Sequence, residues 1–399
     1  MSGLTKGGCM RIVDIREITV PIEADMSNAF INFSKMNVSL LAIVSDVVKN
    51  GAPIVGFGFN SNGRYAQGSL LRERILPRLF EAAPESLVNP DTGHLDPAMI
   101  WKAGMKNEKP GGHGERAVAM GILDMAAWDL AAKLADKPLY AHLADTIGDG
   151  VAPRDKVWVY AAGGYYYPDR GIDALQKEML GYIDLGFRTV KMKIGGAPLA
   201  EDLHRIEAVL KVLPEGCTLA VDANGRFETD EAIEYGKALS NYELHWYEEP
   251  VDPLDFAATA ELASVYPARL ATGENLMSWQ DSRNLLRYGG LRPGLDILQM
   301  DPALSYGLTE YRKTLATLKL EGWSPESCVP HGGHQFNLAI AAAVGLGGIE
   351  SYPGIFAPFG GLADAQDVED SYVSMIDAPG IGLEAKSSMK PLLDQLVDG

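Results

Sequence analysis

Apolar and polar residues follow two different patterns along the chain, one before and one after about residue 150. From Met10 the segment MRIVDIREITVPI alternates apolar and polar residues, which predicts a strand with one buried face. The segments SLLAIVSDVV and APIVGFGF flank Lys49-Asn50-Gly51, which predicts a tight turn between antiparallel strands. Helical spacing from Glu115 to Leu134 predicts a helix with one buried face. We therefore expect an α+β unit over residues 10–150.

After residue 151 short β-type runs alternate with helical stretches. The eight runs are VWVYAAGG, TVKMKI, TLAVDAN, LHWYEEP, LATGEN, DILQMD, SCVPHGG and GGIES. Such alternation predicts βα units around a parallel sheet, and eight runs favour a closed barrel over an open sheet. We expect an α/β fold with this barrel over residues 151–368. The remaining segment, residues 369–399, is expected to return to the first unit.

Composition and charge exclude several classes of function. The 399 residues are 47% hydrophobic and 22% charged, which is typical of a globular protein with a sizeable core. The net charge of −18 makes nucleic acid and anionic membranes poor partners. No apolar run approaches the ~20 residues of a membrane span. We therefore expect neither a nucleic-acid nor a membrane partner.

The N-terminus and the cysteines indicate a cytoplasmic protein. The segment MSGLTKGGCM lacks the apolar core of a signal peptide, and residues 1–9 are expected to be a flexible lead-in. The three cysteines, Cys9, Cys217 and Cys328, are far apart and have no metal-binding spacing. Such usage fits a reducing compartment.

Ionisable residues stand at or near the end of seven consecutive runs. They are Lys193, Asp222, Glu248, Glu274, Asp301, His331 and Glu350. In a barrel of parallel strands the carboxyl ends meet at one mouth, where active sites lie. One acidic residue at a strand end is more often a helix cap or a solvated loop residue, but seven in register are hard to explain in that way. We expect them to form one ring of side chains.

Three of these residues, Asp222, Glu248 and Glu274, are carboxylates from consecutive strands. Without a cation they would repel one another and raise one another's pKa. A set of oxygen ligands without Cys or His favours Mg²⁺ over Zn²⁺. In the sequence YEEP the side chains of Glu248 and Glu249 alternate, and alternation alone does not decide which one faces the metal.

Lysine and histidine residues flank the three carboxylates. Lys191 and Lys193 share one face of their strand, and two amines in a core are costly without partners. We expect Mg²⁺ and Lys191 to lower the pKa of Lys193, which would make it a general base. The sequence KMK alone fits equally a solvent-exposed pair or an anion clamp. Asp301 precedes His331 by one unit, and an Asp can favour the protonated form of a histidine.

A metal, a lysine base and a histidine acid indicate one class of reaction. Mg²⁺ would bind a substrate carboxylate, and the base would remove the adjacent α-proton. The metal and Lys191 would stabilise the enediolate, and the acid would complete elimination or reprotonation. A nicotinamide-dependent dehydrogenase is disfavoured because no GxGxxG follows the first strand.

The motifs KMK, VDANG, WYEEP, TGEN, MDPALSYG and PHGGH occur in the order found in the enolase superfamily. From about Met10 to the C-terminus the sequence resembles the mandelate racemase branch. The resemblance implies a modified TIM barrel, (β/α)7β, under an α+β capping domain that the C-terminal segment completes. It also implies roles: Asp222, Glu248 and Glu274 as Mg²⁺ ligands, Lys193 as base with Lys191 as electrostatic partner, an Asp301–His331 dyad, and Asn224 and Glu350 orienting groups.

The resemblance further implies a Mg²⁺-dependent dehydratase of a 2,3-dihydroxy, acid-sugar-type carboxylate. The muconate cycloisomerase and dipeptide epimerase subgroup has a lysine where Asp301 stands, and glucarate-type enzymes usually have Asn where Glu274 stands. The alternatives are another acid-sugar dehydratase, a racemase or epimerase, and a non-catalytic relative. We expect a small anionic substrate and a homo-oligomer.

A diacid substrate needs a cationic partner at its far end. Arg64 and Lys109 stand in Gly-rich loops of the first unit, and Tyr165 and Asn60 could add polar contacts. Each of these residues could also have no role in substrate binding, since such loops carry Arg and Lys for solubility and Asn to stabilise turns.

Overall fold

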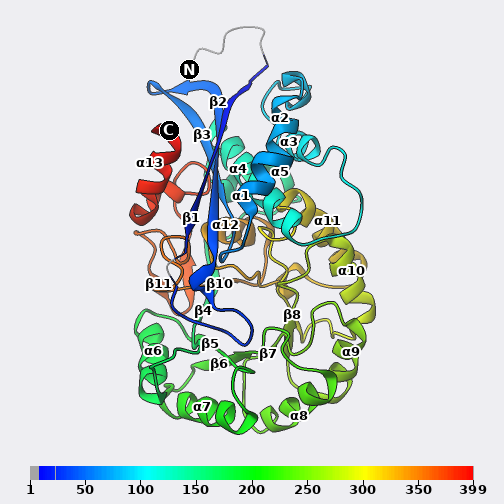
Figure 1. Cartoon of the computed structure of the whole chain (residues 1–399), viewed down its shortest axis with the longest axis vertical. Helices are drawn as coiled ribbons and strands as arrows, with labels where there is room; N and C mark the ends of the chain where they lie inside the picture. Colours follow the sequence, from blue (N-terminus) through cyan, green and yellow to red (C-terminus); the bar gives the residue numbers. More distant parts are fainter. Residues whose placement is uncertain (1–8, 23, 399) are drawn as a thin grey trace.

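A three-stranded sheet with its helices lies above a ring of alternating strands and helices (Figure 1). The computed structural model describes residues 9–22 and 24–398. The expected lead-in of residues 1–9 therefore lies, apart from Cys9, outside the described residues. The domain boundaries expected after residues 150 and 368 stay predictions.

The upper sheet contains β1 (Ile12–Pro21), β2 (Asn37–Lys49) and β3 (Ala52–Phe59), paired antiparallel in chain order. Asn50 and Gly51 both have positive φ, 54° and 86°, as the predicted tight turn requires. Helices follow the sheet: α1 (Gln67–Leu70), α2 (Leu76–Phe80), α3 (Pro97–Gly104), α4 (Glu115–Leu134) and α5 (Leu139–Ile147). The predicted order of three strands and then helices is confirmed.

Helix α4 has the predicted bounds, but the prediction of one buried face is wrong because residues 117–132 are all buried. On one side β3 approaches so closely that a Cβ at Gly58 would lie 2.2 Å from the carbonyl oxygen of Ile122. On the other side a Cβ at Gly121 would lie 2.0 Å from the carbonyl oxygen of Ala303. The helix is therefore enclosed between the upper sheet and a loop of the ring.

The ring is built from βα units in the predicted order. Its strands are β4 (Lys156–Ala162), β5 (Thr189–Lys193), β6 (Thr218–Asp222), β7 (Tyr247–Glu248), β8 (Leu270–Thr272), β9 (Ile297–Leu298) and β10 (Ile349–Ser351). Its helices are α6 (Ile172–Asp184), α7 (Leu199–Val212), α8 (Thr229–Leu239), α9 (Phe256–Val265), α10 (Trp279–Tyr288), α11 (Leu308–Leu320) and α12 (Gln335–Val344). The strands from β4 to β9 pair in parallel, and β10 pairs in parallel with β4.

Residues 328–331 close the ring between β9 and β10. The Val329 amide donates to the Leu298 carbonyl at 2.9 Å on one side. On the other side the Glu350 amide donates to the Pro330 carbonyl at 3.1 Å. This segment occupies the place of the seventh predicted strand, so the fold is the predicted (β/α)7β barrel with its cap.

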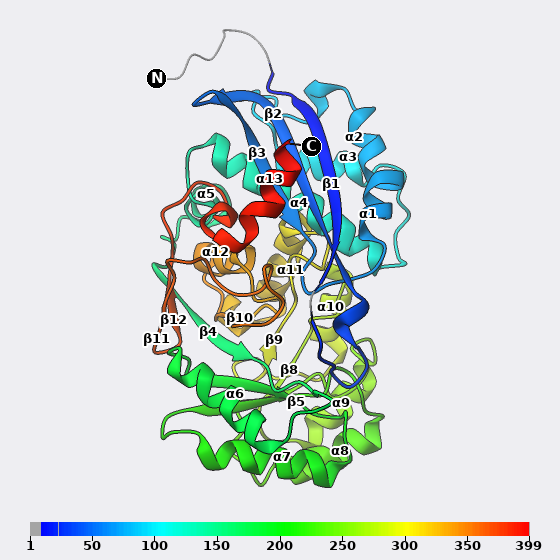
Figure 2. The same cartoon turned by 60° about the vertical axis from the view of Figure 1, so that its left-hand side comes forward.

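The C-terminal segment touches both parts of the molecule. Strands β11 (Val368–Glu369) and β12 (Tyr372–Ser374) form a hairpin, and β12 pairs antiparallel with the first half of β4. Helix α13 (Lys390–Asp398) then lies beside β1 and β2 (Figure 2). Arg16 of β1 donates to the Leu396 carbonyl of this helix at 3.1 Å.

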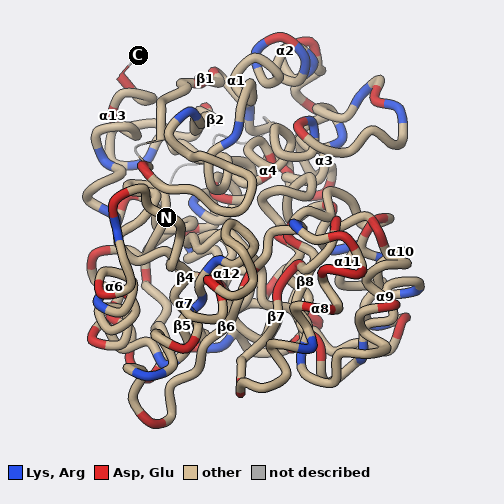
Figure 3. The backbone as a smooth tube through the Cα atoms, turned by 60° about the horizontal axis from the view of Figure 1, so that its bottom comes forward, with Lys and Arg blue, Asp and Glu red and all other residues tan. Residues whose placement is uncertain are grey.

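Charged residues of both signs are interspersed over the outer helices of the ring (Figure 3). Within residues 9–22 and 24–398, none of the helices combines the length and apolarity needed to cross a membrane.

Candidate active site

The strand-end residues converge at the mouth of the barrel that faces the cap. Lys193, Asp222 and Glu248 end β5, β6 and β7, and they are paired in register across neighbouring strands. Glu274 and Asp301 follow β8 and β9 in the next loops, and His331 and Glu350 complete the ring. Each of these side chains is buried. The predicted ring of side chains is therefore present in the structure.

Asp222, Glu248 and Glu274 form a group of three carboxylates suited to a divalent cation. Each offers an oxygen, and these oxygens lie within 4.8 Å of one another. Oε2 of Glu274 is buried and has no hydrogen-bond partner among the described residues. Oδ1 of Asn224, beside the group, is likewise buried and has no hydrogen-bond partner among the described residues. Because unpaired buried oxygens are costly and hard cations prefer oxygen ligands, these residues fit Mg²⁺.

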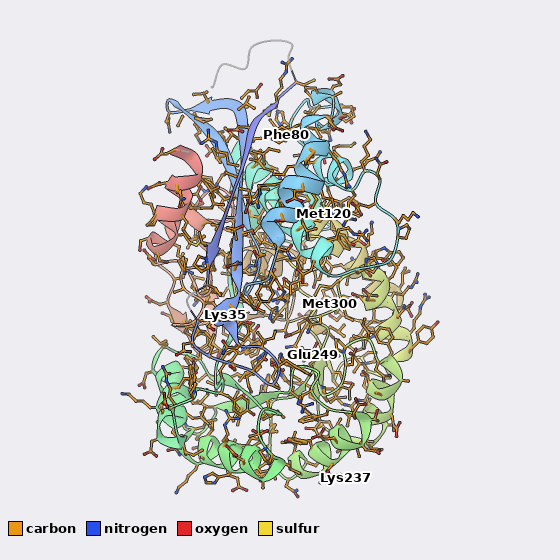
Figure 4. The ribbon with its side chains drawn as sticks, in the orientation of Figure 1. Lys35, Phe80, Met120, Lys237, Glu249 and Met300 are labelled. Atoms are coloured by element: carbon orange, nitrogen blue, oxygen red, sulfur yellow. The ribbon has the colours of Figure 1, made fainter. Side chains whose placement is uncertain are left out.

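The two neighbouring glutamates of YEEP point to different places. Glu248 belongs to the group of three, and its Oε2 accepts a hydrogen bond from the Trp246 indole at 2.7 Å. Glu249, labelled in Figure 4, has a positive φ of 38° and accepts from Nδ2 of Asn275 at 3.0 Å at both carboxylate oxygens. Burial and the charge of Glu274 raise the pKa of Glu249 well above its usual range. The geometry agrees with the first glutamate as the ligand.

The two lysines of β5 both pair with carboxylates of the site, Lys191 with three and Lys193 with one. Nζ of Lys191 lies 2.5 Å from Glu248, 2.7 Å from Glu350 and 3.3 Å from Asp222. Nζ of Lys193 forms an ion pair with Asp222. Lys191 is fully buried, whereas Lys193 lines the cavity of the site. Neither a solvent-exposed pair nor a simple anion clamp describes this arrangement.

The protein's own charges do not lower the Lys193 pKa as expected. Burial lowers the pKa of Lys193, but the charges of Asp222 and other anions outweigh burial and raise it. Burial likewise opposes the charged form of Lys191, and Glu248 and Glu350 raise its pKa well above the usual value. A bound Mg²⁺ would add two positive charges beside Asp222. These charges would lower the pKa of Lys193, as the sequence prediction assumed.

Asp301 and His331 form a hydrogen-bonded pair at the same mouth. Nδ1 of His331 lies 3.1 Å from Oδ2 of Asp301. Oδ1 of Asp301 accepts from the Ala303 amide at 2.8 Å and from Asn337 at 3.1 Å, which fixes its orientation. Burial opposes the charged form of His331, but Glu274 and Asp301 outweigh it and raise the pKa to about 9. The predicted Asp301–His331 pair is therefore present as a hydrogen bond, and the surrounding charges favour the imidazolium form.

A cavity of about 90 Å³ lies between Lys193 and His331. Its lining residues are Asn28, Phe30, Ile31, Phe33, Asn62, Arg64, Tyr165, Lys193, Asn224, Glu274, Asn275, His331, Tyr352 and Phe356. The cap loop that contains Ser27, between β1 and β2, is fixed over the barrel by two backbone hydrogen bonds. They join Ser27 and Tyr166 and are 3.1 and 2.9 Å long. The cavity is thus enclosed by residues of both the cap and the barrel.

Only some of the residues expected to contact the far end of the substrate reach this cavity, Arg64 from the cap and Tyr165 from the barrel. Arg64 lines it, and the Tyr165 ring lies 5.2 Å from Nζ of Lys193. Asn60 does not line it, because its Oδ1 accepts from the Ser39 amide at 2.6 Å within the cap sheet. Lys109 is exposed beside Glu108, which pairs with Arg side chains on the outer side of the cap, and it does not line the cavity either.

Two residues that the sequence did not single out contact the dyad or its neighbours. Nδ2 of Asn62 lies 2.8 Å from Nε2 of His331 and 2.8 Å from the Tyr352 hydroxyl. The Tyr352 hydroxyl donates to Oε2 of Glu350 at 2.6 Å. Tyr352 follows Glu350 by two positions, and this period of two could have indicated a shared face.

Arg205 of α7 donates hydrogen bonds to the backbone just after β4 and at the end of β5, near Tyr165 and Lys193. It is 7% exposed, and its guanidinium donates to the Lys193 carbonyl at 2.8 Å and to the Gly164 carbonyl at 2.9 Å. Its neighbour Asp202 accepts from the Gly195 amide at 2.7 Å, directly after the strand. The ends of β4 and β5 are therefore held together from outside the cavity.

Comparison with known families agrees with this geometry. The family model described as Enolase C-terminal domain-like matches residues 174–389, which is more than half of the chain. The chain belongs to the enolase and mandelate racemase superfamily. The resemblance drawn from the motifs is confirmed at this level, and the superfamily barrel and cap are those described above.

Individual members of the superfamily show what the chain is similar to. Arabinonate dehydratase of Saccharolobus solfataricus is 29% identical over 67% of this chain and 71% of its own length. A 3,6-anhydro-alpha-L-galactonate cycloisomerase of Streptomyces coelicolor is 31% identical over 68% of this chain and 70% of its own. The crystal structure of a racemase from Streptomyces coelicolor A3(2) with bound magnesium matches with a TM-score of 0.76. It is 25% identical and covers 97% of this chain and 99% of that chain.

Proposed function

We propose that this superfamily member is a Mg²⁺-dependent dehydratase of a small 2,3-dihydroxy carboxylate, with D-tartrate as the substrate and oxaloacetate and water as the products. The observation that carries the proposal is the placement of Lys193 and His331 on one small cavity beside Asp222, Glu248 and Glu274. An arabinonate dehydratase among the relatives supports the class of reaction.

Asp222, Glu248 and Glu274 would hold the metal ion, and a related structure contains magnesium. Bound Mg²⁺ supplies positive charge that polarises a substrate carboxylate and offsets the anionic field around Lys193. Lys191, fully buried between Glu248 and Glu350, adds a fixed positive charge beneath the cavity. The site would thus stabilise negative charge that develops on the substrate carboxylate.

Lys193 would act as the general base and His331 as the general acid. Neutral Lys193 would take the proton from C2 of the substrate, which leaves the electron pair in an enediolate. The C3–O bond would then break as protonated His331 gives a proton from Nε2 to the departing hydroxyl, which leaves as water. The Asn62 amide, whose Nδ2 lies 2.8 Å from Nε2, would first have to turn away. The enol product would become the 2-keto acid. With a pKa of about 9, His331 is protonated at neutral pH and suited to this step.

The size and charge of the cavity support a short diacid as substrate. A cavity of about 90 Å³ suits a small acid, and the cap contributes Arg64 opposite the barrel residues. Arg64 would bind the distal carboxylate through its guanidinium. The segments GFNSNGRYAQG, NEKPGGHGER, YAAGGYYYP and EGWSPESCVPHGGHQ also resemble D-tartrate dehydratase, and this resemblance suggested the substrate.

A racemase of the same branch is the second candidate. A racemase with bound magnesium is among the structures that match nearly the whole of this chain. In that case Lys193 and His331 would exchange the proton at C2 from opposite sides without loss of water.

The test is a panel of acid sugars that includes D-, L- and meso-tartrate, incubated with the protein and Mg²⁺ while 2-keto acid is measured. We expect oxaloacetate to accumulate from D-tartrate and less or none from the other tartrates. Deuterium exchange at C2 without any keto acid would favour the racemase, and turnover of longer acids alone would refute the tartrate assignment.

A further inference from the structure

Four aromatic side chains form one wall of the cavity, which we call the aromatic wall: Phe33, Tyr165, Tyr352 and Phe356. All four are buried. Phe356, in the loop after β10, contacts each of the other three rings edge to face. The distances between ring centroids are 5.0 Å to Tyr352, 5.1 Å to Phe33 of the cap and 6.1 Å to Tyr165. Phe356 is therefore the centre of the wall.

The aromatic wall lies across the mouth of the barrel from the metal ligands. It follows β4 and β10, which are neighbours in the ring, whereas Glu248 ends β7 and Glu274 follows β8, half-way round the ring. A substrate with one carboxylate at the metal ligands therefore extends across the cavity towards the wall. The cavity is small, about 90 Å³, so the position of the Phe356 ring decides how long that substrate can be.

The backbone around Phe356 holds this ring in place. The Phe356 carbonyl accepts from the amides of Phe359 and Gly360, both at 2.9 Å. Lys386 of the C-terminal segment is 7% exposed and donates to the Gly360 carbonyl and, at 3.4 Å, to the Gly361 carbonyl. Phe356 also has a positive φ of 57°, which a bulky residue rarely adopts. A large ring kept at a strained position next to a cavity points to a role for that ring.

We propose that Phe356 limits the length of the substrate, so that the site binds four-carbon diacids and excludes six-carbon ones. This inference rests on the proposed function, since it assumes that a diacid binds with one carboxylate at the metal ligands. A longer chain meets the Phe356 ring, which cannot move aside because Phe33, Tyr165 and Tyr352 pack against it. One methylene too many in such a pocket typically changes discrimination by about 10–200-fold.

The test measures the affinities of succinate and adipate by calorimetry with Mg²⁺, for the wild type and Phe356→Ala. These four- and six-carbon diacids carry no hydroxyl group, so their binding does not depend on turnover. We expect the wild type to bind succinate at least about tenfold more tightly than adipate, and Phe356→Ala to lower this ratio about tenfold or more. Phe359→Ala is the matched control, because it removes a buried ring from the same loop outside the cavity lining and should keep the wild-type ratio.

A second variant, Phe356→Leu, keeps part of the side-chain volume and should give a ratio between those of the wild type and Phe356→Ala. The same ratio in the wild type and in Phe356→Leu, or adipate bound as tightly as succinate by the wild type, would overturn the inference. Oxaloacetate formation from D-tartrate would then still support the proposed function. Conversely, the expected shift in the ratio without keto acid from any acid of the panel would refute the proposed reaction and support the length limit.

Discussion

Mg²⁺ binding should displace a proton from the site at neutral pH. In the metal-free site the carboxylates of Asp222, Glu248, Glu274 and Glu350 outnumber the two lysine ammonium groups. Burial and the charge of Asp222 therefore raise the pKa of Glu248 to about 8. A carboxylate must be ionised to bind a metal, so a proton on Glu248 has to leave. We expect the affinity for Mg²⁺ to rise with pH up to about pH 8.

The size of the effect follows from the pKa of Glu248. At pH 7 the group is about 90% protonated, so binding should release about 0.9 proton. Deprotonating Glu248 at pH 7 therefore costs about 1.4 kcal/mol of the binding free energy. Each pH unit below 7 raises this cost by about the same amount. The Kd for Mg²⁺ should accordingly be about fiftyfold larger at pH 6 than at pH 8 and should change little above about pH 9.

Isothermal titration calorimetry in two buffers of different ionisation enthalpy measures the released proton directly, and titrations at pH 6, 7 and 8 give Kd. Glu274→Gln should weaken Mg²⁺ binding at every pH, because it removes one ligand charge. Glu321→Gln, on the outer side of the barrel beside Arg287, is the control and should bind as the wild type does. A Kd that is independent of pH, together with no released proton, would refute the raised pKa of Glu248 on which this prediction depends.

Three further predictions concern single side chains. Arg205→Met should cost about 3–5 kcal/mol of stability in urea unfolding, because it leaves the Lys193 and Gly164 carbonyls without their charged donor, and Arg205→Lys should recover part of this loss. His331→Asn should abolish keto-acid formation, measured with C2 exchange by NMR, while exchange persists; equal turnover would exclude His331 as the acid. Arg64→Ala should raise KM for a diacid about tenfold or more, because a charged hydrogen bond is lost, whereas exposed Lys109→Ala should leave KM unchanged in the same kinetic assay.

The barrel residues of the site were predictable because the fold repeats. Parallel strands bring their carboxyl ends to one mouth, so runs ending at Lys193, Asp222 and Glu248 had to place those side chains together. The dyad of Asp301 and His331 followed from the same repeat. Alternation alone did not separate Glu248 from Glu249, and the positive φ of Glu249 explains why, since a turn begins there.

The cap residues were less predictable because loops follow no repeat. Asn60 and Asn62 stand in one turn, but a positive φ of 54° at Asn62 directs the second amide to His331 while Asn60 binds the sheet. The burial of α4 on every side depends on glycine contacts with distant segments. The direction of the Lys193 pKa depends on the balance between burial and the nearby anions, above all Asp222, and the sequence does not give that balance.

The rate of keto-acid formation from D-tartrate with Mg²⁺, compared between the wild type and Lys193→Ala, tests the central claim most directly. The account predicts that the wild type forms oxaloacetate and that Lys193→Ala forms none and incorporates no deuterium at C2, while it still binds Mg²⁺ in calorimetry. Undiminished oxaloacetate formation by Lys193→Ala would contradict the account, because the proton at C2 would then have another acceptor.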